Sequence, residues 1–257
     1  MRIRFLALAL CGLQATASAC ELRFALGDGE VLPYLAGNGS QVRSERPGIA
    51  VELADLASQA IGCKAVFNRV PTKRVLAETA AGKYEAGFMY SYDPERAKEL
   101  AYPMKQSAVD SSRRIATLSY YLYRRKDSPV DWDGKQITGL SGNIGANLGW
   151  SIAKDLAAKG YGVEEAPGPV ANFNKLVHGR IGAFATQDID GDPVLALGKF
   201  AQAERLSTPL STKHYFVVFN LAFARSKAEL VENFWTQLGI QRDKQLPALL
   251  KKYQADD

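Results

Sequence analysis

Two long β-rich runs, at residues 115–123 and 215–223, interrupt an otherwise regular alternation of strand-like and helix-like segments in this 257-residue chain. Alternating strands and helices are typical of an α/β fold with a largely parallel sheet. The two runs flank the middle of the chain. We therefore expect one lobe built from both ends of the chain and a second lobe built from its middle, joined by two crossing strands.

The predicted fold class is therefore α/β with two lobes, each a mainly parallel sheet with flanking helices. Lobe 1 is expected to comprise residues 20–111 and 212–257, and lobe 2 residues 112–211. Two connecting strands make a hinge that bends but does not rotate freely. Ligands of such folds bind at the carboxyl ends of the parallel strands, which places the expected site between the lobes.

Local patterns predict the elements at two further places. In the middle of the chain, we expect a strand over residues 136–140, a glycine-bearing loop over 141–145 and a helix over 146–158. Near the end of the chain, apolar residues at helical spacing predict two separate helices, one carrying residues 230–238 and the other 246–253.

The first 19 residues have the pattern of a secretory signal peptide. Arg2 and Arg4 precede a short apolar run, and residues 17–19 supply the small-x-small pattern of a cleavage site. The run is shorter than the roughly 20 residues needed to cross a bilayer. Cleavage after Ala19 predicts a periplasmic protein that begins at Cys20. A lipid anchor on that cysteine is the alternative, but Ala17 stands where a lipoprotein signal usually has leucine.

Charge and motifs argue against several function classes. Lysine and arginine number 32 against 27 acids, a net charge of +5, and removal of residues 1–19 leaves 30 basic residues and a charge of +3. This mixed distribution is unlike the basic patch of a nucleic-acid binder. His178 and His214 lack neighbouring ligands at metal-binding spacing, and no phosphate loop or nucleophile elbow is present. We expect no cofactor, no metal, no nucleic-acid partner and no enzymatic activity.

The cysteines predict one disulfide. Cys11 leaves with the signal peptide, so Cys20 and Cys63 remain as an even pair in an oxidising compartment. Each stands just before an expected strand, and a helix lies between them, so both strands start at the same sheet edge. Adjacent strands lie about 5 Å apart, a distance that a disulfide can bridge. Two free thiols are the alternative.

Short motifs follow one another in a characteristic order along the chain. They stand at residues 33–34, 48–53, 82–85, 91–96, 101–103, 132–135, 141–142 and 179–181. In this order and spacing the sequence resembles the family 3 solute-binding proteins, which are receptors of polar amino-acid ABC transporters. The resemblance covers nearly the whole mature chain and implies a type II periplasmic binding fold.

The resemblance also implies a set of ligand-binding residues. Arg96 corresponds to the family's arginine that holds the ligand's carboxylate, a task that suits a planar, permanently charged guanidinium. Ser91 matches a position that helps to bind the ligand's polar head. Tyr34 belongs to the first motif, at residues 33–34, and is a further candidate for ligand binding. Phe88, Tyr90 and Tyr92 are candidates for the apolar walls of the cleft, although Phe88 and Tyr90 fit the core equally well.

Other positions depart from the family pattern. The loop that usually reads Gly-Ser/Thr-Thr is matched here to residues 142–144, which leaves Asn143 as its polar side chain. Gln187 stands where an aspartate usually meets the ligand's ammonium, and Asp188 is one residue out of register. Glu30 lies where an aromatic side chain is usual. Arg74 begins a helix beside the expected site, or else points to solvent.

These residues support one main function and two alternatives. The expected function is capture of an amino acid or related carboxylate between the lobes for ABC-type transport, by a monomer that contacts a membrane permease or a sensor. One alternative is an orphan receptor or accessory protein for a sensor or dehydrogenase system. The other is a dehydratase-type enzyme, for which Glu30 or Asp188 would have to act as a general acid or base.

Overall fold

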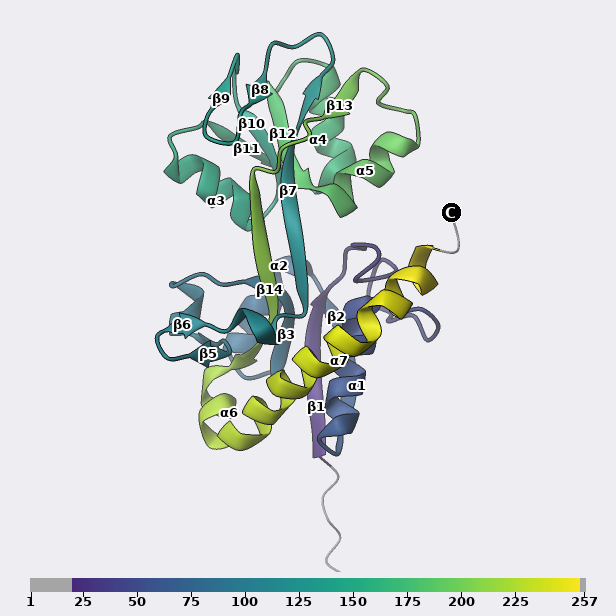
Figure 1. Cartoon of the computed structure of the whole chain (residues 1–257), viewed down its shortest axis with the longest axis vertical. Coiled ribbons are helices and arrows are strands. Elements are labelled where there is room, and N and C mark those ends of the chain that lie inside the picture. The colour runs from purple at the N-terminus through teal and green to yellow at the C-terminus, as the bar shows by residue number, and fades with distance from the viewer. Residues whose placement is uncertain (1–19, 255–257) are drawn as a thin grey trace, which may run out of the picture.

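A computed structural model describes residues 20–254 and places them in two lobes (Figure 1). Two long strands, β7 (Ala116–Arg125) and β14 (Ser211–Asn220), run side by side from one lobe to the other. These are the two crossing strands that the β-rich runs predicted. The predicted signal peptide lies outside the described residues. No helix within them is long and apolar enough to span a membrane.

One ten-stranded sheet continues through both lobes. Eight of its strands follow the order β11-β10-β12-β7-β14-β3-β1-β2, while β13 pairs with β7 and β4 pairs with β14. In each lobe the strands beyond the crossing pair are parallel to one another, whereas β7 and β14 pair antiparallel to their neighbours. The expected α/β fold is therefore confirmed. The outer strands are β1 (Cys20–Gly27), β2 (Cys63–Val70), β3 (Ala86–Ser91), β10 (Ile144–Asn147), β11 (Val163–Ala166) and β12 (Ala183–Gln187).

Helices pack against the sheet in both lobes (Figure 1). The lower lobe of Figure 1 contains α1 (Ile49–Ala60), α2 (Thr72–Ala80), α6 (Leu221–Ser226) and α7 (Ala228–Gln254), and the upper lobe contains α3 (Ser151–Ala158), α4 (Gly168–Val177) and α5 (Asp188–Ala196). The short elements are η1 (Arg96–Lys98), η2 (Ser111–Arg113), β4 (Leu100–Ala101), β5 (Met104–Lys105), β6 (Ala108–Val109), β8 (Asp131–Trp132), β9 (Ile137–Thr138) and β13 (Ala203–Arg205).

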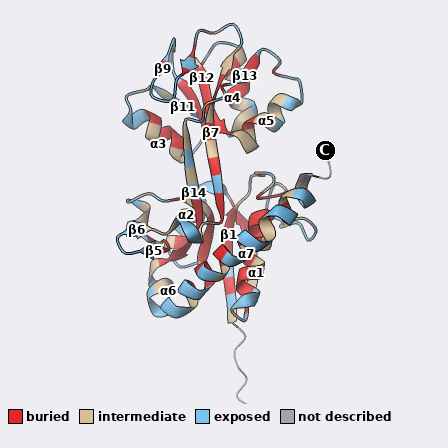
Figure 2. Cartoon of the chain, in the orientation of Figure 1, coloured by how far each residue is buried: buried red, intermediate tan, exposed pale blue. Residues whose placement is uncertain are grey.

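Each lobe contains buried residues (Figure 2) and a cluster of aromatic rings. In the lower lobe, the ring of Phe24 lies 5.3 Å from that of Phe88 and 5.6 Å from that of Phe234. In the upper lobe, Phe173 contacts Tyr123 and other rings at similar distances. Burying one such side chain stabilises a fold by roughly 1.5–3 kcal/mol. The larger hydrophobic cluster continues from Phe24 and Phe88 through the crossing strands to Ile144 and Ile152, and a second cluster around Phe173 lies in the upper lobe. Phe88 therefore belongs to the core.

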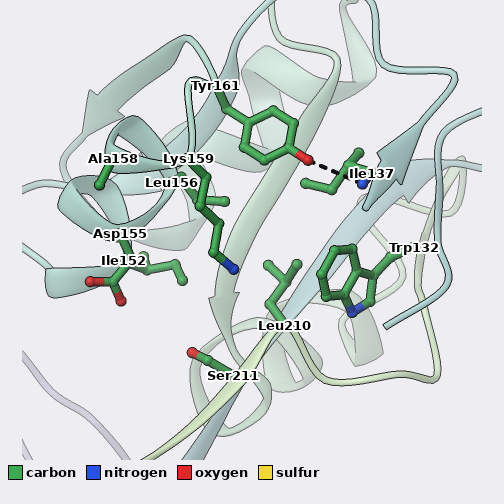
Figure 3. Close-up of a pocket in the computed structure, with 10 residues that line it drawn as sticks. All are labelled: Trp132, Ile137, Ile152, Asp155, Leu156, Ala158, Lys159, Tyr161, Leu210 and Ser211. Carbon is green, nitrogen blue, oxygen red and sulfur yellow. Dashed lines mark hydrogen bonds between the residues drawn. The ribbon is translucent and has the colours of Figure 1, made fainter. Parts of the chain in front are cut away.

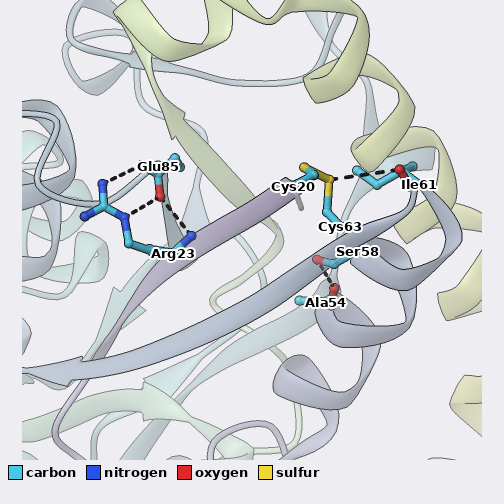
Figure 4. The surroundings of a disulfide bond; sticks show 7 residues. All are labelled: Cys20, Arg23, Ala54, Ser58, Ile61, Cys63 and Glu85. Carbon is cyan, nitrogen blue, oxygen red and sulfur yellow. Dashed lines mark hydrogen bonds and ion pairs between the residues drawn. A yellow bond between two sulfur atoms is a disulfide. The ribbon is translucent and has the colours of Figure 1, made fainter. Parts of the chain in front are cut away.

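The predicted disulfide is present (Figure 4). Cys20 and Cys63 are register partners at the starts of the parallel strands β1 and β2, and their Cα atoms are 4.5 Å apart. A lipid anchor would be attached to the Cys20 sulfur through a thioether, and that sulfur is already bonded to Cys63. The disulfide therefore argues against the lipid-anchor alternative.

Two local predictions are wrong. Residues 144–147, expected to close a loop and begin a helix, form the buried strand β10, and α3 starts only at Ser151. Short apolar runs do not distinguish a buried strand from a helix by periodicity. The chain also ends in one long helix, α7, instead of two. Arg242, in the polar middle of α7, joins the helix to the segment before β7, because its buried guanidinium donates to the carbonyls of Ser112 and Arg114.

Candidate functional site at the junction of the lobes

Side chains from both lobes and from a crossing strand meet at one corner. The hydroxyl oxygens of Ser91, at the end of β3, and Ser151, at the start of α3, lie 3.5 Å apart. Lys213 on β14 donates to Ser151 at 2.8 Å and also pairs with Asp155 of α3. We call Ser91, Arg96, Ser151 and Lys213 the junction site. It lies beyond the carboxyl ends of β3 and β10, where parallel α/β sheets bind ligands.

The turn after β3 holds Arg96 in place. The carboxylate of Asp93 accepts hydrogen bonds from the backbone N–H groups of Glu95 (2.9 Å) and Arg96 (3.1 Å), which fixes the turn that leads into η1. The Arg96 guanidinium donates to the Ser91 carbonyl at 2.9 Å and lies 5.7 Å from the centre of the Tyr90 ring. Arg96 is half-buried, and no carboxylate within residues 20–254 lies at ion-pair distance from its side chain. Its positive charge is therefore not neutralised by a salt bridge in that part of the chain.

The acid that helps to position Arg96 is held ionised. Burial by itself would raise the pKa of Asp93, but the two backbone hydrogen bonds and the nearby charges of Arg96 and Lys154 bring the pKa below its ordinary value. Because Lys154 belongs to α3 of the upper lobe, this interaction also reaches across the junction.

Buried polar groups connect the crossing strands next to this corner. The amide of Gln187 donates to the Tyr215 hydroxyl at 2.6 Å, and that hydroxyl donates to Tyr120 at 3.1 Å. All three residues are buried, and burial raises the pKa of both tyrosines. Gln187 therefore serves the hinge network, and its amide is already hydrogen-bonded.

Asp188 begins α5 immediately after this network. Its carboxylate accepts the N–H of Ile189 at 2.9 Å and lies 3.9 Å from the Arg205 guanidinium. Burial raises the pKa of Asp188, an effect that the Arg205 charge opposes. Burial likewise raises the pKa of Tyr34 in the lower lobe, and the charge of Asp188 adds to that rise. Tyr34 itself is largely buried, and its carbonyl accepts the N–H of Ala50 in α1.

The predicted residues Glu30 and Arg74 have other surroundings. The Glu30 carboxylate accepts the N–H of Gly37, and its own N–H donates to Asn38, so it braces the loop after β1. The buried Arg69 fastens the same loop by donating to three of its carbonyls. Arg74 is exposed on α2 with no side-chain partner among the described residues.

Asn143 does not reach the junction site, because it lies at the wrong end of its strand. It precedes β10, and its side chain is next to Gly162, which precedes β11. The loop that faces the other lobe is residues 148–150, followed by Ser151. Matching the family loop to residues 142–144 was therefore an error of register, caused by the unrecognised strand β10.

The tyrosines after β3 divide between two environments. Tyr90 is partly buried beneath the Arg96 guanidinium, and burial raises its pKa. Tyr92 is exposed and meets the edge of Tyr102 at 5.3 Å. The Tyr102 hydroxyl donates to the Ser91 carbonyl at 2.9 Å, and its burial raises its pKa to about 12. Tyr92 can therefore offer an aromatic face beside the junction site.

Sequence reasoning missed Ser151 and Lys213. Nothing in the local pattern singles them out, because they are 62 residues apart and meet only when α3 packs beside β14. A correct assignment of β10 would have pointed to Ser151 as the residue that starts the following helix.

A separate cavity of about 330 Å³ lies within the upper lobe (Figure 3). Its wall is mainly apolar, and the Tyr161 hydroxyl accepts the N–H of Ile137 at its rim. None of the four junction-site residues lines it. Within residues 20–254, no group of three or more histidine, cysteine or acidic side chains is arranged to hold a metal ion.

Solved structures share this architecture. A histidine kinase sensor domain with similarity to periplasmic binding proteins matches with a TM-score of 0.71 at 16% identity, over 91% of this chain and 96% of that chain. A mutant of ArgBP from T. maritima matches with a TM-score of 0.66 at 16% identity, over 92% and 96%. The GluR0 ligand-binding core from Nostoc punctiforme, in complex with L-glutamate, matches with a TM-score of 0.65 at 16% identity, over 90% and 98%.

No protein-family model and no curated protein matches the sequence. The structural likeness, at this low identity, establishes the fold alone: the chain has the two-lobed fold of periplasmic binding proteins.

Proposed function

We propose that this protein is an extracytoplasmic solute-binding protein whose lobes close on a small carboxylate-bearing molecule at the junction site. The observation that carries the proposal is Arg96, a half-buried guanidinium without a carboxylate partner among residues 20–254, at the carboxyl end of β3. A guanidinium in this setting is a ready receptor for a carboxylate, because it donates two parallel hydrogen bonds.

Groups on the opposite lobe and on a crossing strand complement Arg96. Ser151 presents its hydroxyl 3.5 Å from that of Ser91, and the ammonium of Lys213 lies beside it. A ligand held between these groups contacts both lobes only when they are close together. Such differential contacts would shift the population from open to closed forms. The two crossing strands suit this rigid-body bending.

The likeness to other binding proteins supports the same function. ArgBP and the GluR0 core are named for amino-acid ligands, and the latter was solved with L-glutamate. The disulfide and the signal-like N-terminus agree with a site of action outside the cytoplasm. We propose that the closed form is recognised by a membrane permease of ABC type. The likeness to a histidine kinase sensor domain favours a sensor as the second candidate partner.

Isothermal titration with small carboxylates, before and after Arg96→Gln, tests the proposal. We expect the substitution to weaken binding by about 100-fold or more, because the anion loses a charge-assisted double hydrogen bond. Arg225→Gln is the matched control, since Arg225 is exposed on α6 and lies outside the proposed site. Equal affinities in the wild type and Arg96→Gln would contradict the proposed site.

A further inference from the structure

The charges around the junction site restrict the ligand further. Building on the proposed function, we infer that this site selects a carboxylate without a cationic amine, such as a 2-oxo or 2-hydroxy acid, over the corresponding amino acid. An amino acid would bring an ammonium group into the closed junction, and that group needs an acidic or carbonyl partner there. The argument depends on which acids are free to provide one.

The acids nearest the junction site already have partners. Asp155 forms an ion pair with Lys213, and Asp93 accepts two backbone N–H groups while lying close to the charges of Arg96 and Lys154. Recruiting either carboxylate for a ligand would break interactions that hold the junction site together. Neither is an available receptor for an ammonium.

The acids that follow β12 also have partners, although Asp188 has its nearest cation only at 3.9 Å. Gln187 is neutral, 3% exposed and bonded to Tyr215. Asp188 accepts its own helix's N–H and lies beside the Arg205 guanidinium, which also pairs with Asp192 at 3.0 Å. Two residues further on, the Asp190 carboxylate accepts hydrogen bonds from Thr186 and Asn147 within the upper lobe.

The cations are less completely matched. Lys213 has Asp155, but Arg96 has no acid at ion-pair distance among residues 20–254. With Asp93 and Lys154 included, the three cations Arg96, Lys154 and Lys213 face the two acids Asp93 and Asp155, so this corner has one excess positive charge that a monoanion neutralises. The carboxylate of a zwitterionic amino acid would pair with Arg96, but the ammonium group of the same ligand would lose its water next to other cations. This cost in binding free energy disfavours amino acids.

Titration calorimetry with matched ligand pairs tests this inference. L-lactate and pyruvate share their carbon skeleton with L-alanine, and 2-oxoglutarate shares its skeleton with L-glutamate. We expect the member without the amine to bind at least about tenfold more tightly in each pair that binds. If L-alanine or L-glutamate binds as tightly as its partner, the inference is wrong, while the Arg96 experiment still decides the proposed function. If none of these acids binds, the inference is contradicted, while the Arg96 experiment with other small carboxylates still decides the proposed function.

Two variants locate the source of the selectivity. Asp188→Asn keeps an oxygen that can accept the Ile189 N–H, and we expect it to leave the ratio between lactate and alanine unchanged. A selective loss of alanine binding would show that Asp188 holds the ammonium and would overturn the inference. Gln187→Glu adds an acid whose oxygen can accept from the Tyr215 hydroxyl once that hydroxyl turns its proton away from Tyr120, and we expect it to shift the ratio toward alanine. A ratio unchanged in folded Gln187→Glu protein would also contradict the inference.

Discussion

The hydroxyl of Ser151 accepts a hydrogen bond from Lys213, and this bond joins the first residue of a helix in one lobe to a strand that passes between the lobes. The same hydroxyl lies 3.5 Å from that of Ser91 in the other lobe. Ser151 is therefore the point at which a lobe, the hinge and the opposite lobe come together, and a bound anion would be in contact with all three.

Ser151→Ala tests whether this corner contributes to binding. We expect it to weaken the affinity for the bound carboxylate about fivefold or more, because one net hydrogen bond contributes about 1 kcal/mol. The free energy of unfolding should change by less than about 1 kcal/mol, since Lys213 retains Asp155. Calorimetry and urea denaturation measure the two quantities.

Ser226→Ala is the control for that experiment, because Ser226 lies on α6 and bonds only to the carbonyl of Phe223. It should leave the affinity unchanged. Equal affinities for wild type and Ser151→Ala would remove Ser151 from the proposed site without affecting the assignment of Arg96.

Sequence reasoning predicted the parts of the fold that depend on local pattern. The two β-rich runs identified the crossing strands, and cysteines at the starts of two strands identified the disulfide. It failed at β10, because the four-residue run Ile144–Asn147 contains a glycine and no alternation. Gly145 is small there for a packing reason: a Cβ atom would lie 2.8 Å from the Asn172 side chain of α4.

The site itself was less accessible to sequence reasoning. Arg96 and Ser91 belong to one short loop, so a local motif identified them together. The contact of Ser151 with Lys213 depends on tertiary packing, which no local pattern records. The choice between Gln187 and Asp188 depended on their partners, Tyr215 and Arg205, which come from distant parts of the chain. The residue numbers at which the lobes separate stay a prediction.

Loss of the disulfide should destabilise the protein substantially. The bond closes a loop with a sequence separation of 43 residues between β1 and β2. In the chain-entropy model, a loop of this size corresponds to about 4 kcal/mol. We expect the double variant Cys20→Ser/Cys63→Ser to lose about that much free energy of unfolding, measured by urea denaturation. Reducing agent should destabilise the wild type similarly and leave the variant unaffected; a change under about 1 kcal/mol would contradict this role.

Arg69 is expected to be essential for the loop that follows β1. Its buried guanidinium donates to the carbonyls of Asp28, Ala36 and Gly37. The Asp28 carbonyl also accepts the N–H of Gly39, so removing the guanidinium takes away the donor of the Ala36 and Gly37 carbonyls. Arg69→Met should therefore lower the free energy of unfolding by at least about 2 kcal/mol. Arg74→Met, on an exposed face of α2, should stay within about 0.5 kcal/mol of the wild type. Equal stabilities of the two variants in urea would refute the bracing role.

The pH dependence of stability should reveal the buried acid of the upper lobe. Burial raises the pKa of Asp190, although its hydrogen bonds from Thr186 and Asn147 oppose the shift. Because the folded state then holds its proton more tightly than the unfolded state, this group favours folding below its unfolded pKa of about 3.8. Its contribution to stability declines as the pH rises from that value through the raised pKa.

Asp190→Asn removes this titration and retains an oxygen that can accept from Thr186 and Asn147. We therefore expect the stability of the variant, relative to the wild type, to increase as the pH is raised from 4 to 8, as measured by urea unfolding at intervals along that range. Asp188→Asn is the comparison. Burial raises the pKa of Asp188 as well, so we expect the stability of this variant relative to the wild type to change with pH in the same direction, although the charge of Arg205 opposes the rise. A difference between wild type and Asp190→Asn that stays constant with pH would show that Asp190 titrates at the same pH in the folded and unfolded states.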